Sequence, residues 1–237
     1  MKKEDDKKAF LTELYRAADM RRWNDKIRYV ELRELDHQAH KMTIAYILGK
    51  CEERKNPDNI DWAAIIERGI FEFLERLVLT DIKPQVRRLI EQRPDVYRQL
   101  REMVFKHFEF KVPRFVGFDE RFKQYLSTSK NDVKSDRNAR IIDAAGFCAR
   151  AWEWHVIKQA NLEDYEVNDI EKRFEEDWQQ YDDLQGISTY NQGSQGTTPY
   201  DQIKGFIDLC GALRFQETFS ADSDEGIEAR LNQTARI

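Results

Sequence analysis

The chain has 237 residues, of which 41% are hydrophobic and 35% are charged, and its net charge is −5. This composition supports a sizeable core and excludes a chain that is disordered throughout. The acidic balance also lacks the basic footprint of a nucleic-acid-binding protein, so there is no strong nucleic-acid signal.

The compartment is indicated by the chain start and by the cysteines. The start, MKKEDDKKAF, lacks the apolar region of a secretory signal. No apolar run reaches the roughly 18 residues that a membrane span requires, so no membrane association is expected. Cys51, Cys148 and Cys210 are isolated and odd in number. They predict reduced core thiols and a cytoplasmic protein.

Apolar residues recur at helical spacing along most of the chain, and only ten glycines and five prolines interrupt it. This pattern predicts an all-α fold. The helix over residues 60–79 is the most apolar and is expected to lie at the centre. In chain order, helices are expected over residues 9–19, 34–53, 60–79, 81–108 (two helices divided near Pro94), 122–128, 139–161, 166–181 and 200–216.

Composition divides the chain into three parts. Residues 1–185 are expected to form one helical domain. Residues 186–200 are rich in Gly, Ser, Thr, Asn and Gln, which predicts a flexible loop. Residues 201–237 are expected to be a C-terminal helix and tail that pack on the domain or on a partner.

Two histidines stand three residues apart in the segment DHQAHK. His37 and His40 therefore lie on one face of the predicted helix over 34–53. Either they are surface histidines at a solvated helix start, or one or both bind a metal through a neutral imidazole nitrogen.

Three carboxylates stand within apolar segments. Glu72 and Glu75 share one face of the helix over 60–79, and Asp143 follows two isoleucines in the helix over 139–161. A buried carboxylate needs solvent, a cation or a metal as its partner. Helical bundles build metal sites from such inward-facing His and carboxylate side chains, so the pattern is compatible with a mixed nitrogen and oxygen site.

Four segments in order resemble the HD superfamily of metal-dependent phosphohydrolases, and within it the 5′-deoxynucleotidase branch. They are RRW at 21–23, DHQAHKMTIA at 36–45, EFLERLVLTDIKPQVR at 72–87 and RIIDAAGFCA at 140–149. The chain departs from that family at its defining His-Asp pair, because Glu72 and Phe73 stand in those places. The resemblance implies an HD-domain-like helical bundle with an additional C-terminal helix.

The resemblance also implies a set of site residues. His40, or His37 in the other register, would bind a divalent metal (Mn, Co, Fe, Zn or Mg) together with Glu72 and Asp143. Glu75 would act as the catalytic base. Arg22, Trp23 and Asp81 would contact a nucleotide, and Asp81 is also predicted as a catalytic residue. From the residues alone, Trp23 is equally well explained as a core anchor and Asp81 as a helix cap.

Two functions follow from these expectations. One is a divergent hydrolase that acts on a nucleotide or similar phosphate ester with a divalent metal. The alternative is a catalytically degenerate HD-like protein that binds a nucleotide or a protein partner. A purely structural helical adaptor is a third hypothesis. Because the related enzymes resemble dimers, a homodimer is expected.

Overall fold

The computed structural model describes residues 2–79, 82, 86, 89–90, 92–109, 117–128, 136–194 and 196–214. Within these ranges the protein is all-α, which confirms the predicted fold class. The extended pairing in this part of the chain is one isolated antiparallel bridge between Arg21 and Arg33. Asp81 and the residues after Arg214 lie outside the described ranges.

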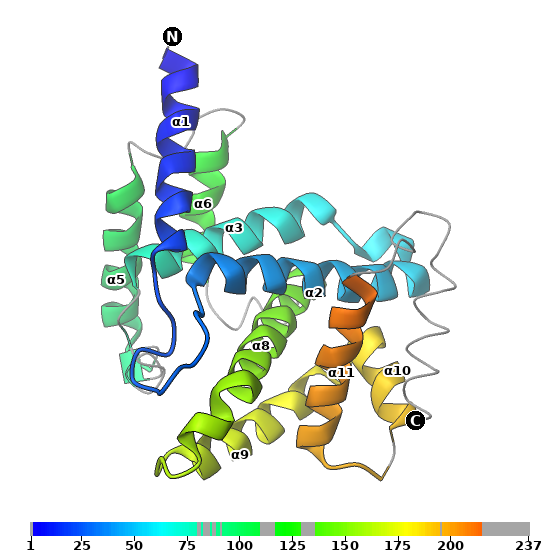
Figure 1. The fold of residues 1–237 in the computed structure, drawn as a ribbon. Coiled ribbons are helices and arrows are strands. Elements are labelled where there is room, and N and C mark those ends of the chain that lie inside the picture. Colours follow the sequence, from blue (N-terminus) through cyan, green and yellow to red (C-terminus); the bar gives the residue numbers. More distant parts are fainter. Residues whose placement is uncertain are drawn as a thin grey trace.

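Figure 1 shows how the helices of the described ranges pack together. Asp61 caps α3 by accepting a hydrogen bond from the Ala64 amide at 3.0 Å, and Asp136 caps α8 through the Asn138 amide at 2.9 Å. The α-helices are α1 (Lys2–Tyr15), α2 (Glu34–Lys55), α3 (Trp62–Val78), α5 (Pro94–Phe108), α6 (Phe118–Ser127), α8 (Arg137–Ile157), α9 (Val167–Trp178), α10 (Gln185–Gly193) and α11 (Pro199–Arg214). Short 3₁₀ turns join several of them, among them η4 (Lys158–Asn161).

The central helix is α8, and the prediction that residues 60–79 form the central helix is wrong. From Ile141 to Ala149 every residue of α8 is buried except Asp143. The reason is that α8 carries several alanines and a glycine in this stretch, which let α2 pack closely against it. Alanine and glycine have low hydropathy values, so the hydropathy of the sequence underestimates how deeply such a helix is buried.

Helix α3 instead joins two hydrophobic cores. Ile65 belongs to the larger core, which is formed mainly by α2, α8, α9, α10 and α11. Phe71 and Leu74 belong to a second core with Val104 of α5 and Phe122 of α6. The position of α3 between the two cores places Arg68 and Glu72 beside α2 and α8.

The segment predicted as a flexible loop is partly helical. Residues 185–193 form α10, in which Gly186, Ile187 and Tyr190 are buried. A Cβ atom at Gly186 would lie 3.2 Å from Leu48 Cδ2, so the glycine lets α10 approach α2 closely. Burial of these residues outweighs the low helix propensity of the Gly/Ser/Thr/Asn composition.

The C-terminal helix α11 packs on α8, α9, α10 and α2 (Figure 1). Its residues Ile203, Phe206 and Cys210 are buried in the larger core. Cys51, Cys148 and Cys210 are free thiols in this interior, and burial raises the pKa of Cys210 well above its ordinary value. The protein thus carries unreactive core thiols rather than a reactive cysteine.

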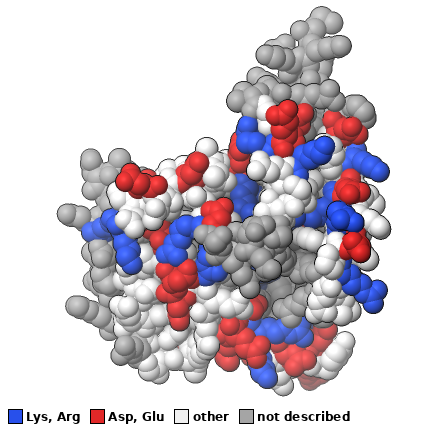
Figure 2. All heavy atoms as spheres, turned by 180° about the vertical axis from the view of Figure 1, so that it is seen from behind, with Lys and Arg blue, Asp and Glu red and all other residues white. Residues whose placement is uncertain are grey.

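Surface charge is mixed. Figure 2 shows Lys and Arg side chains interspersed with Asp and Glu over the described atoms of the rear face. In the described ranges, no helix combines the length and the apolarity needed to cross a membrane. On this face, binding sites are therefore sought in local clusters of charge.

Two helical glycines give a matched test of this packing. A Cβ at Gly49 would lie 2.5 Å from Trp62 Cη2, and the Trp62 ring is held by its hydrogen bond to Glu53 at 2.8 Å. We expect Gly49→Ala to lower the free energy of unfolding by about 1–3 kcal/mol through overpacking. A Cβ at Gly146 meets Lys41 Cε at 3.5 Å, an ordinary contact. Gly146→Ala is therefore expected to stabilise the fold by about 0.5–1 kcal/mol.

Urea unfolding followed by circular dichroism measures both glycine variants. A stabilising Gly49→Ala would contradict the position of the Trp62 ring against α2. A destabilising Gly146→Ala would contradict the close but unstrained approach of Lys41 to α8.

Candidate functional site

Three of the predicted site residues meet in a buried ion network. Arg22 Nε donates to both carboxylate oxygens of Glu153 at 2.8 and 3.0 Å, and its Nη1 donates to Glu34 at 2.6 Å. Trp23 Nε1 donates to Glu153 at 2.8 Å, and His37 Nδ1 lies 3.0 Å from the same carboxylate. Four of these side chains are buried, and Trp23 packs on the ring of Trp154.

The network extends to α3, because Arg76 Nε donates to Glu34 at 3.3 Å. Burial alone would raise the pKa of Glu153, but the nearby His37 and Arg22 lower it to about 2. Burial and then the charge of Arg22 lower the pKa of His37, so its imidazole is neutral at pH 7. The donors of Arg22 are directed at Glu153 and Glu34 inside the protein. In this arrangement Arg22 and Trp23 join the segment before α2 to α8, and His37 joins α2 itself to α8.

Trp23 has a backbone φ of +56°, which a tryptophan rarely adopts. The hydrogen bond to Glu153 and the packing against the tilted Trp154 ring hold the residue in this conformation. The core-anchor interpretation of Trp23 describes these contacts well.

The other histidine candidate lies elsewhere on α2. His40 is half-buried, and its ring packs edge-on against the indole of Trp152 on α8, with 5.0 Å between the ring centroids. His37 and His40 therefore face different partners, Glu153 in one case and Trp152 in the other.

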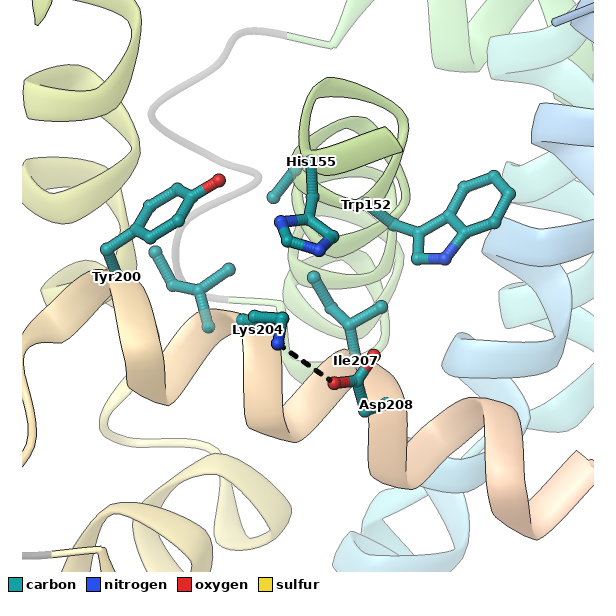
Figure 3. Close-up of a pocket in the computed structure, with 8 residues that line it drawn as sticks. Trp152, His155, Tyr200, Lys204, Ile207 and Asp208 are labelled. Carbon is teal, nitrogen blue, oxygen red and sulfur yellow. Dashed lines mark ion pairs between the residues drawn. The ribbon is translucent and has the colours of Figure 1, made fainter. Parts of the chain in front are cut away.

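Trp152 also lines a small pocket between α8 and α11 (Figure 3). His155 comes from α8, and Tyr200, Lys204 and Asp208 come from α11, where Lys204 Nζ lies 3.9 Å from Asp208. The empty space is about 230 Å³ and includes open solvent. Ligand pockets usually measure roughly 300–1,000 Å³, so this pocket is too small for a nucleotide.

Glu72 and Asp143 do come together, at the junction of α2, α3 and α8. Lys41 Nζ of α2 forms an ion pair with Glu72. Arg68 Nε lies 3.0 Å from the other oxygen of Glu72, and Arg68 Nη2 lies 3.7 Å from Asp143. Arg68 is thus placed between the two carboxylates. Together with Arg150 we call this group the carboxylate–cation cluster.

Arg150 belongs to the cluster through α8. Asp143, Gly146 and Arg150 share one face of that helix because they are three and four residues apart. A Cβ at Gly146 would lie 3.5 Å from Lys41 Cε and 3.8 Å from Arg150 Nη1, so both cations reach the same point on α8. Arg150 is exposed. In the described part of the chain it makes no ion pair.

The pKa of Asp143 is raised to about 6, first by partial burial and then by the charge of Glu72. Arg68, Lys41 and Arg150 act in the opposite direction. Since 41% of the Asp143 side chain is exposed, solvent screens part of the repulsion. Asp143 therefore takes up a proton near pH 6, which leaves the cluster more cationic.

Glu75, the expected catalytic base, lies one turn along α3 and is buried. It accepts a hydrogen bond from the Tyr125 hydroxyl at 2.7 Å, and Arg101 Nη2 lies 3.6 Å away. The Arg101 guanidinium also stacks on the Tyr125 ring at 4.8 Å. These contacts join α3 to α5 and α6.

The expected metal ligands do not converge on one point. His37 faces Glu153, His40 faces Trp152, and Glu72 is paired with Lys41 and Arg68. Among the described residues, no three His, Cys, Asp or Glu side chains come close enough to hold a metal ion. The donor set therefore does not fit the mixed site that the HD resemblance implies, and the metal stays a prediction.

Five residues of these two groups were not predicted as site residues: Glu34, Lys41, Arg68, Arg150 and Glu153. Local signals point to two of them. Arg68 stands four residues before Glu72 on one helix face, and Glu153 is a carboxylate in an apolar segment, as Asp143 is. The pairing of Lys41 with Glu72 spans 31 positions and has no local signal.

Comparison with protein-family models, curated proteins and solved structures finds no significant match to this chain.

Proposed function

We propose that this protein binds a phosphorylated small molecule, a nucleotide in the first instance, at the carboxylate–cation cluster, and that it does so without a metal. It would be an HD-like protein in which binding is retained and hydrolysis is lost. The observation that carries this proposal is Arg150, an exposed guanidinium without an ion-pair partner in the described chain, beside two further cations.

The charge balance of the cluster favours an anion. Three cations, Lys41, Arg68 and Arg150, face two carboxylates, Glu72 and Asp143. Lys41 and Arg68 both bind Glu72, which leaves Arg150 as the excess charge. A guanidinium offers a planar pair of N–H donors that matches two phosphate oxygens, and such charge-assisted bonds are among the strongest in proteins.

Two of the three cations are also held in place. Lys41 is buried to 7% exposure although it is charged, and its stem lies across Gly146. Arg68 packs its guanidinium 5.6 Å from the centroid of the Tyr125 ring. A phosphate that binds Arg150 would therefore meet two cations that are already fixed, and the ordering cost would be limited to the Arg150 side chain.

A metal-dependent phosphohydrolase is the second candidate, and one observation favours it. Glu72 and Asp143 lie close enough for the charge of one to raise the pKa of the other. Two carboxylates as close together as these attract a cation. A divalent ion would compete with Lys41 and Arg68 for Glu72 and Asp143. This candidate requires the two side chains to exchange their present partners.

Isothermal titration in the presence of a chelator tests the proposal. Inorganic phosphate and a panel of 5′-nucleoside monophosphates are titrated into the full chain at pH 7.5. We expect at least one to bind, and Arg150→Ala to weaken that binding about 10-fold or more, the worth of one charge-assisted contact. Arg98→Ala is the matched control, because Arg98 is an exposed arginine on α5 that pairs with Asp95, outside the carboxylate–cation cluster.

Absence of binding at millimolar ligand, or equal affinity of Arg150→Ala and the parent, would contradict the proposal. The same panel is then assayed for phosphate release with Mn²⁺, Co²⁺ or Mg²⁺ added. Turnover that depends on the metal and disappears in Glu72→Gln would establish the second candidate instead.

A further inference from the structure

A second surface of the molecule is built from two segments far apart in the sequence. The loop before α2 is closed at its base by hydrogen bonds between Arg22 N and Leu32 O at 2.9 Å and between Glu34 N and Met20 O at 2.9 Å. Its tip, residues 24–30, lies against the turn after α8, residues 157–166.

Several polar contacts fix the tip on this turn. The Asn161 side chain accepts from the Ile27 amide at 2.9 Å and donates to the Ile27 carbonyl at 2.8 Å. Lys26 Nζ binds Asp164 at 2.9 Å and also pairs with Glu166. Tyr29 donates its hydroxyl proton to the Val156 carbonyl. Asn161 is itself buried, so the two segments form one rigid surface.

This surface exposes large apolar and aromatic side chains from both segments. We call them the tip patch, and they are Ile27 (66% exposed), Tyr29 (62%), Val30 (39%), Leu162 (55%) and Tyr165 (89%). These five large side chains stand on two segments that are hydrogen-bonded to each other, and a cluster of exposed apolar side chains of this kind marks an interaction site.

The accessible charges around the tip patch are acidic. Asp25 is 43% exposed and Glu163 is exposed, whereas the Lys26 side chain is only 4% exposed beneath Asp164 and Glu166. Arg28 is half-buried and donates to the Arg22 carbonyl at 2.8 Å. If two copies of this chain met through the tip patch, their acidic rims would face and repel each other. A partner with basic residues around an apolar stripe complements both features.

We infer that the tip patch docks a basic amphipathic segment of another protein. The apolar stripe of that segment would cover Ile27, Leu162 and Tyr165, and its basic residues would face Asp25 and Glu163. Tyr29 and Tyr165 supply the large, two-torsion aromatic anchors that dominate binding energy in interfaces. Because the surface is already fixed by hydrogen bonds, docking costs little ordering of the protein.

A synthetic 14-residue peptide of leucine and lysine, with leucines at helical spacing, is the probe for this inference. Its control is a peptide of the same composition in scrambled order. Fluorescence anisotropy of the labelled peptides measures binding to the full chain. We expect the amphipathic peptide to bind at least 10-fold more tightly than the scrambled one, and added salt to weaken that binding.

Two variants of the patch and one control locate the binding. The double variant Ile27→Ser/Tyr165→Ser and the charge reversal Glu163→Lys are each expected to weaken it about 10-fold or more. Ile66→Ser is the control, because Ile66 is 50% exposed on α3, outside the patch, and is expected to leave the affinity unchanged.

Three results would overturn the inference: equal binding of both peptides, insensitivity to the patch variants, or an equal loss in Ile66→Ser. Sedimentation equilibrium of the chain alone is the further measurement. Self-association that the double variant abolishes would assign the tip patch to a second copy of this chain and would likewise overturn the inference.

Discussion

Glu153→Gln is expected to lower the free energy of unfolding by about 3–5 kcal/mol at pH 7.5, as removal of one charge from a buried network does. The Glu153 carboxylate receives both Arg22 hydrogen bonds, the Trp23 indole and the His37 ring. A neutral amide of the same shape leaves the Arg22 guanidinium buried with Glu34 as its one remaining ionic partner in this network. Urea unfolding followed by tryptophan fluorescence measures the loss.

The loss should depend on pH with a defined sign. The pKa of Glu153 is about 2 in the folded protein and near 4.5 in the unfolded chain. Its contribution to stability is therefore present above pH 4.5 and is lost as the pH falls from 4.5 towards 2. The difference between the parent and Glu153→Gln should shrink over that interval. A difference below about 1 kcal/mol at pH 7.5 would contradict a structural role for this network.

An exposed ion pair provides the control for this variant. Arg98 and Asp95 lie 3.1 Å apart with side chains 69% and 83% exposed. Arg98→Ala should change the free energy of unfolding by less than about 1 kcal/mol at any of these pH values.

Arg68→Met is expected to destabilise the protein by about 2–3 kcal/mol at pH 8, because Glu72 and Asp143 then face each other without the cation between them. The deficit should shrink towards pH 5. Asp143 already has a pKa of about 6 against an ordinary value of 3.8, and loss of Arg68 raises that pKa further. Its folded form binds the proton more tightly, so lowering the pH towards 3.8 restores stability.

Thermal unfolding at pH 8 and pH 5 compares Arg68→Met with Arg121→Met. Arg121 also pairs with a glutamate of α3, Glu67 at 2.8 Å, but its side chain is 40% exposed. The control should lose less stability than Arg68→Met at pH 8, because an exposed ion pair contributes little. If the loss of stability in Arg68→Met did not depend on pH, removal of Arg68 would not change the pKa of Asp143, and this prediction would be wrong.

Helical periodicity accounts for what the sequence predicted well. The expected helices over 34–53, 60–79 and 139–161 correspond closely to α2, α3 and α8. The expectation that carboxylates in apolar segments have a partner is confirmed for Glu72 and Asp143, because Arg68 lies beside both. Patterns of this kind are local, so a single sequence carries them.

Contacts between distant segments account for what the sequence missed. Arg22 and Glu153 are 131 positions apart, and Lys41 and Glu72 are 31 positions apart. Such pairings are set by how the helices pack, not by propensity or spacing. The same holds for α10, whose polar composition predicts a loop and whose buried Ile187 and Tyr190 make it a helix.

Asp143→Asn tests the central claim most directly, because the two candidate functions predict opposite effects. In a cationic phosphate site, removal of this carboxylate's charge strengthens binding. We expect inorganic phosphate or the best nucleoside monophosphate to bind the variant about fivefold more tightly at pH 7.5 with a chelator present, the worth of one partly screened charge. Weaker binding in Asp143→Asn, or binding that requires Mn²⁺ and is lost with Asp143, would contradict the account.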